Sequence, residues 1–208
     1  MQPVWTRLKR EEAHGVLGKL GDHPDAVIFS REVTEVSFRK LPFYTNYKLY
    51  RLVNYATMPT FSMTYLSNGE DFISIDGTAL AIYAANAKDP IRINEMSVIP
   101  YLDFFFSNVQ GSEGDVFLIK DPRKMPFMDS LSANQQQSVL TSFRPLKVAN
   151  DTVVNVFRVT GTIYYGGGLL STTINVTPDG KLSFHEQNLL LSGIHFPYSP
   201  HSANWIEG

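Results

Sequence analysis

Alternating apolar and polar residues dominate the last third of the chain. The alternation covers residues 153–165, 169–177 and 181–189. A period of two residues is typical of half-buried β-strands, because successive side chains of a strand point to opposite faces of its sheet. Short glycine-containing segments separate the three stretches. The pattern therefore predicts an antiparallel meander with one apolar and one polar face.

The turns between these strands predict their register. Gly167-Gly168, taken as a two-residue turn, pairs Val159 with Val176. The Pro-Asp-Gly segment at residues 178–180 suits a three-residue loop with glycine in the left-handed conformation, and this loop pairs Val176 with Leu182. Both turns independently place the apolar side chains on the same face of the meander.

Other periodicities predict helices and a second group of strands. Helical spacing of apolar residues covers residues 3–20 and 78–87, and a polar helix is expected over 132–141. A strongly apolar helix follows Asn94 or Ser97 as its cap and runs to 109. β-strand patterns cover the segment 34–76 and the short runs 26–29 and 115–120. Ser132 with Gln135 forms the pattern of a capping box, which predicts a helix start at that point.

Asn68-Gly69 predicts a β-hairpin in the first group of strands. A two-residue turn would place Tyr65 opposite Phe72, whereas a three-residue loop would place Tyr65 opposite Ile73. We expect the three-residue loop, because it aligns the apolar side chains of both strands.

This order of elements predicts an α+β domain that spans residues 1–208, with helices packed on one face of an antiparallel sheet. The sheet combines the C-terminal three-stranded meander with the N-terminal hairpin. The order resembles that of cystatin-like and NTF2-like domains, and the resemblance implies that a curved sheet wraps the helix at residues 98–109. It concerns the fold alone, since one fold hosts many functions. The segment 194–208 is rich in aromatic residues and proline and is expected to be irregular.

Composition and charge narrow the classes of function. The 208 residues include no cysteine, so disulfides, cysteine-ligated metals and thiol nucleophiles are excluded. The formal net charge of −2 argues against a nucleic-acid-binding protein, which normally carries a basic stripe. The sequence contains neither a run of 18 apolar residues nor a signal-peptide pattern, so we expect a cytoplasmic protein without a membrane partner. No pattern in the sequence implies a cofactor or a metal ion.

The polar face of the meander supplies the candidate site. Its predicted rows place Thr160 opposite Asn175, Thr162 opposite Thr173, and Tyr164 opposite Ser171, with His185 beside Thr173. The other residues assigned to these rows are Arg158, Ser183 and Gln187. A concave sheet lined in this way would bind a small polar ligand through hydroxyl and amide groups. Alternatively, the rows simply face water, as one side of an antiparallel sheet commonly does.

Two functions follow from these residues. The first is a non-catalytic binding or protein-interaction module, monomeric or homodimeric, that uses either the polar face or the aromatic segment 38–55. Core packing is the alternative interpretation of that aromatic segment. The second function is a small metal-independent enzyme, in which His185 is the general acid–base group and Tyr164 or Arg158 polarises the substrate. His195 and His201 are too widely spaced to predict a metal site.

Overall fold

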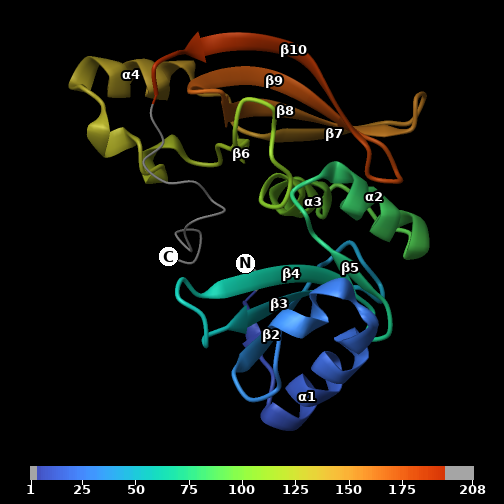
Figure 1. The fold of residues 1–208 in the computed structure, drawn as a ribbon. Helices are drawn as coiled ribbons and strands as arrows, with labels where there is room; N and C mark the ends of the chain where they lie inside the picture. The colour runs from blue at the N-terminus through green and yellow to red at the C-terminus, as the bar shows by residue number, and fades with distance from the viewer. Residues whose placement is uncertain (1–3, 195–208) are drawn as a thin grey trace. The chain divides into compact units, whose positions relative to one another are not determined.

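The computed structural model describes residues 4–194, apart from the side chains of Asp22 and Asp25. Within this range the protein is α+β, with two antiparallel five-stranded sheets and four α-helices (Figure 1). The chain divides into two compact units. The N-terminal unit consists of 1–76 with 80–92, and the C-terminal unit consists of 77–79 with 93–208.

The N-terminal unit is built on a sheet of strand order β1-β2-β3-β4-β5. Its strands are β1 (Thr6–Arg7), β2 (Thr34–Lys40), β3 (Lys48–Asn54), β4 (Phe61–Ser67) and β5 (Phe72–Ser74). Helix α1 (Arg10–Lys19) lies along one face of β2–β4 (Figure 1), where Leu17 and Leu20 pack against Leu52 and Tyr65. Helix α2 (Ala79–Lys88) confirms the helix predicted from residue 78.

Two predictions near the N-terminus are wrong. The predicted helix at 3–20 begins only at Arg10, because Thr6 and Arg7 form β1 and pair with β2. The apolar run at 26–29 is not a strand, since Pro24–Ile28 forms a 3-10 helix. Its apolar character reflects packing instead, because Phe29 lies in the core beside α1. Hydrophobic periodicity cannot distinguish a strand from a helical turn in a run of only four residues.

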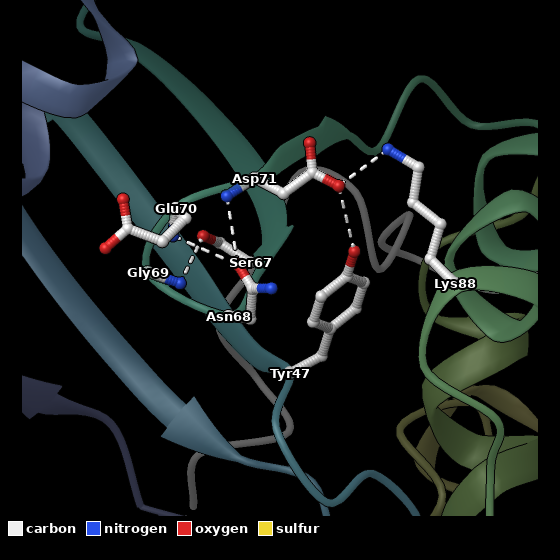
Figure 2. Close-up of polar contacts among 7 residues, drawn as sticks. All are labelled: Tyr47, Ser67, Asn68, Gly69, Glu70, Asp71 and Lys88. Carbon is white, nitrogen blue, oxygen red and sulfur yellow. Dashed lines mark hydrogen bonds and ion pairs between the residues drawn. The ribbon is translucent and has the colours of Figure 1, made fainter.

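The β4–β5 hairpin has neither of the two registers considered. Tyr65 lies opposite Ser74 and Leu66 lies opposite Ile73, which leaves a four-residue loop at Asn68–Asp71. Side chains hold this loop (Figure 2). The Asn68 side-chain oxygen accepts from the backbone N–H groups of Glu70 at 3.0 Å and Asp71 at 2.9 Å. These hydrogen bonds favour a longer loop than the Asn-Gly pair alone predicts.

The C-terminal unit contains the meander. Its sheet has the order β10-β9-β8-β6, with β7 also paired to β8. The strands are β6 (Phe117–Leu118), β7 (Lys147–Asp151), β8 (Val156–Tyr165), β9 (Gly168–Val176) and β10 (Leu182–Leu191). The helices are α3 (Val98–Phe106) and α4 (Ala133–Ser142), and the 3-10 helices Pro122–Lys124 and Met128–Ser130 precede α4. The capping box predicted at Ser132 and Gln135 is present at the start of α4.

One predicted turn of the meander is confirmed and the other is displaced. Leu182 lies opposite Val176, as the Pro-Asp-Gly loop predicted. The glycine turn is centred on Gly166 and Gly167, with φ of 57° and 77°, so Val159 pairs with Ile174 rather than with Val176. A displacement of two residues leaves every side chain on its predicted face, because strand side chains alternate with a period of two.

Helices pack on both faces of the meander. On the apolar face, the Tyr101 hydroxyl of α3 donates to the Gly180 carbonyl at 2.7 Å, and Phe106 contacts Phe184 with ring centroids 6.0 Å apart. On the opposite face, Tyr164 belongs to a buried cluster with Phe127 and with Val139 of α4. The expectation of helices on one face only is therefore wrong. Arg158, Thr160, Thr162 and Tyr164 of β8 looked alike in sequence, but only the end of the strand with Thr162 and Tyr164 is covered.

Candidate functional site

Six of the predicted site residues form two neighbouring rows across β8, β9 and β10. We call these rows the polar rows. In the first, Arg158 lies opposite Asn175, and Asn175 lies opposite Ser183. In the second, Thr160 lies opposite Thr173, and Thr173 lies opposite His185. The pairing of β9 with β10 is as predicted from Leu182 opposite Val176 to His185 opposite Thr173, and it shifts beyond that point. The predicted pairings of Thr160 with Asn175, Thr162 with Thr173 and Tyr164 with Ser171 are wrong, because the glycine turn is displaced by two residues.

Thr162 and Tyr164 lie on the same face but are buried. The Thr162 hydroxyl accepts from the backbone N–H of Arg144 at 2.8 Å. The Tyr164 hydroxyl donates to the Ile194 carbonyl at 3.2 Å, and its ring stacks on Phe127. Both hydroxyls therefore bond to backbone groups of the same unit. Thr162 was predicted to bind a ligand and Tyr164 to polarise a substrate. In the structure, the two side chains instead connect β8 to the segments at Arg144 and Ile194.

The structure does not bring His185, Tyr164 and Arg158 together. Arg158 and Tyr164 are six residues apart on one strand, which separates them by about 20 Å. Arg158 forms an ion pair with Asp151 at 2.8 Å. The exposed His185 ring nitrogen Nε2 lies 3.1 Å from the Ser183 hydroxyl, two residues earlier on the same strand.

The aromatic segment 38–55 contributes mainly to packing. Phe43, Tyr44, Tyr47 and Tyr50 are buried, while Tyr55 remains 61% exposed. Basic residues also pack on aromatic rings. Lys48 lies 4.9 Å from the ring centre of Phe38, and Arg39 and Arg51 lie at 5.0 and 4.6 Å from that of Trp5.

A polar network in the N-terminal unit was not singled out by sequence reasoning. We call it the loop clasp (Figure 2). Asp71 at the end of the β4–β5 loop accepts from the Tyr47 hydroxyl at 3.2 Å and from the Lys88 ammonium at 2.6 Å. The neighbouring Glu70 pairs with Lys19. One loop is thereby tied to the last residue of α1 and to the last residue of α2.

The electrostatics of the loop clasp favour a structural role. Burial, followed by the charge of Asp71, raises the pKa of Tyr47 to about 12. The hydrogen bond and charge of Lys88 lower the pKa of Asp71 below its ordinary value. Efficient general acid–base groups have pKa values near the working pH, and these two groups move away from neutrality in opposite directions. The clasp therefore holds fixed charges and is poorly suited to proton transfer.

The C-terminal unit contains a pocket with an aromatic lining. Its volume is about 250 Å³. We call it the aromatic pocket, and its lining consists of Phe105, Phe106, Val109, Gly111, Val116, Tyr165, Phe184 and Gln187. The lining carries no formally charged side chain. Its walls come from the end of α3, the segment that follows it, and the apolar face of β8 and β10.

Local interactions hold the Tyr165 wall of the pocket in place. The Tyr165 hydroxyl lies 3.0 Å from the Ser112 hydroxyl and accepts from the backbone N–H of Glu113 at 3.2 Å. Gly111 packs directly beneath the ring, because a Cβ at this position would lie 2.8 Å from a Tyr165 ring carbon. Only glycine permits this approach without a shift of the ring.

Sequence reasoning identified several pocket walls but not the pocket. Phe105, Phe106 and Val109 belong to the strongly apolar helix that was predicted to run to 109, and Phe184 belongs to the alternating stretch 181–189. Gln187 was assigned to the polar rows, and the structure places it in the pocket lining instead. An unusually high density of phenylalanine at 104–106 was the available signal, but packing explains such a density equally well.

Comparisons with known proteins add no family to this description. No protein-family model, curated protein or solved structure matches the chain. Among the described residues, none of the helices is long and apolar enough to cross a bilayer. Within the same residues, no group of three His, Asp or Glu side chains is placed to hold a metal ion.

Proposed function

We propose that this protein is a non-catalytic binding module whose C-terminal unit binds a small apolar ligand in the aromatic pocket. The observation that carries the proposal is an uncharged aromatic lining around about 250 Å³. A dry apolar cavity of about 150 Å³ is sufficient to bind benzene in another protein, so this larger and partly open pocket suits a small aromatic compound. The proposed ligand is apolar, unlike the polar ligand expected from the opposite face of the meander.

The chemistry of the lining supports binding rather than catalysis. It contains no carboxylate, imidazole or amine that could transfer a proton. The pocket also adjoins the packed core of the C-terminal unit, which is formed without a ligand. Tyr101 and Leu102 of α3 are fully buried, and Phe105 and Phe106 are 5% exposed. A preformed site of this kind loses little conformational entropy when a ligand enters it.

A neutral dye tests the proposal. N-phenyl-1-naphthylamine fluoresces strongly in apolar surroundings, and we expect the wild-type protein to bind it with a saturable fluorescence increase. The variant Val109→Trp places an indole in the pocket and should weaken dye binding about tenfold or more, because the added ring occupies the space of the ligand.

The matched control is Val153→Trp. Val153 is 92% exposed in the β7–β8 turn and does not line the pocket. This variant should bind the dye like the wild type, and far-UV circular dichroism should confirm that both variants are folded. Equal dye binding by Val109→Trp and the wild type, or no saturable binding by the wild type, would refute the proposal.

A further inference from the structure

An irregularity in β10 decides which polar group enters the aromatic pocket. His185 pairs with Thr173 and Asn188 pairs with Ser171, so two residues, Glu186 and Gln187, stand opposite Thr172 alone. This arrangement is a β-bulge. Without the bulge, strict alternation would place Gln187 on the same face as His185. With it, Gln187 lines the pocket on the face of Phe184.

The bulge is held by specific interactions. Glu186 has φ of 50°, a left-handed conformation that is normally occupied by glycine at the first position of such a bulge. The Thr172 hydroxyl donates to the His185 carbonyl at 3.1 Å, and the Asn188 side-chain amide donates to the Glu186 carbonyl at 3.2 Å. Strained backbone that is supported in this way is concentrated at functional sites in proteins.

Gln187 brings one uncommitted polar group to the pocket. Of the two side chains in the lining with polar groups, Tyr165 already bonds to Ser112 and Glu113. The Gln187 carboxamide makes no hydrogen bond to any part of the chain that the structure describes. A carboxamide presents a donor and an acceptor side by side, so its natural complement is a group with an adjacent acceptor and donor.

We infer that the ligand of the aromatic pocket is a neutral, planar, lactam-like ring compound that pairs with the Gln187 carboxamide through two hydrogen bonds. The inference rests on the proposed function and adds the ligand class and the residue that selects it. The lining disfavours a charged ligand, because it offers no side chain of opposite charge. The apolar walls contact the faces of the ligand ring, and the Gln187 carboxamide forms hydrogen bonds with one polar edge of the ligand.

Three probes of similar shape separate these contributions. 2-Quinolinone has a lactam edge, 1-methyl-2-quinolinone lacks the donor of that edge, and naphthalene lacks both polar groups. Their affinities are measured by displacement of N-phenyl-1-naphthylamine. In the wild type we expect 2-quinolinone to bind about tenfold more tightly than its methylated analogue, because methylation removes the hydrogen-bond donor that the Gln187 side-chain oxygen would accept from.

Gln187→Met removes both polar atoms with little change in side-chain size. We expect the affinity ratio of 2-quinolinone to naphthalene to fall about tenfold in this variant, while naphthalene binding is retained. Gln137→Met is the matched control, because Gln137 is an exposed glutamine on α4 outside the pocket lining. It should leave all three affinities unchanged.

The outcomes distinguish the two proposals. An unchanged ratio in Gln187→Met, together with dye and naphthalene binding that Val109→Trp abolishes, would overturn the lactam inference and leave the apolar binding function intact. Failure of every probe to displace the dye, or dye binding that is insensitive to Val109→Trp, would overturn both. A reduced ratio confined to Gln187→Met supports the inference.

Discussion

The loop clasp of the N-terminal unit and the aromatic pocket of the C-terminal unit use polar groups in opposite ways. In the clasp, Asp71 is shared between Tyr47 and Lys88, so each charged or hydroxyl group already has a partner (Figure 2). In the pocket, the exposed Gln187 carboxamide has no protein partner among the described residues, and it lies beside apolar walls. Both arrangements join a loop or bulge to neighbouring elements.

Whether the polar groups already have protein partners distinguishes a structural polar cluster from a candidate ligand-binding site. Groups that satisfy one another gain little from an added ligand, because each new hydrogen bond replaces one that already exists. An amide without a protein partner exchanges its hydrogen bonds to water for hydrogen bonds to a complementary ligand, and no protein contact is lost in the exchange. The number of polar residues in a cluster is therefore a poor guide to function, and their hydrogen-bond partners are a better one.

The largest expected effect tests whether the pocket wall is distinct from the core. Phe127 is fully buried against Tyr164, and Phe127→Ala should lower the free energy of unfolding by about 3–5 kcal/mol. Phe184 is 37% exposed at the pocket, so Phe184→Ala should cost only about 1 kcal/mol. Urea denaturation followed by circular dichroism measures both. Equal losses would mean that Phe184 is as much a core residue as Phe127.

Asp89 tests how strongly buried polar groups stabilise the N-terminal unit. Its carboxylate accepts from the backbone N–H groups of Asn46 at 3.0 Å and Tyr47 at 2.9 Å. Asp89→Ala leaves these donors unpaired, and we expect a loss of about 2–4 kcal/mol in the free energy of unfolding. Asp89→Asn retains an acceptor and should lose less. A loss below about 1 kcal/mol for the alanine variant would contradict this structural role.

Alkaline pH should weaken the loop clasp through Tyr47. Burial and Asp71 raise its pKa to about 12 in the folded protein, whereas an unfolded tyrosine titrates near 10. Its contribution to stability, roughly 2 kcal/mol, is complete below pH 10 and is lost as the pH rises toward 12. The fall in unfolding free energy between these values should be smaller in Tyr47→Phe. Identical pH profiles for the two proteins would exclude this contribution.

The ion pair between Asp71 and Lys88 should have the smallest effect. Their side chains are 45% and 54% exposed, so solvent screens the attraction between them. A double-mutant cycle with Asp71→Asn and Lys88→Met should give a coupling energy of no more than about 1 kcal/mol. A coupling above about 2 kcal/mol would indicate that the pair is effectively desolvated, and the contrast with the pocket would then be weaker.

The accuracy of the sequence-based fold varied with the local turn chemistry. The Pro-Asp-Gly loop has one low-energy arrangement, and the register of Leu182 with Val176 is as predicted. The run of three glycines at Gly166–Gly168 permits more than one two-residue turn, so local preference could not select the register. Contacts outside the turn hold the observed register, since the backbone N–H of Ile194 donates to the Gly167 carbonyl at 2.9 Å.

The candidate site was less accessible to sequence reasoning than the fold. Alternation placed His185 and Thr173 together, because regular strands preserve their faces. The same rule placed Gln187 on the wrong face of the sheet, because alternation alone does not reveal a bulge when the bulged residue is not glycine. Glu186 gave no such signal, and its left-handed backbone depends on hydrogen bonds from Thr172 and Asn188.

The sequence by itself determined the α+β class, the meander with its two faces, the capped helix at Ser132 and the apolar character of α3. These features depend on period, capping and turn chemistry, which act over a few neighbouring residues. Tertiary structure decided the division into two units, the cover over Tyr164 and the entry of Gln187 into the pocket. Each of these depends on contacts between segments that are distant in the chain, and no local pattern encodes such contacts.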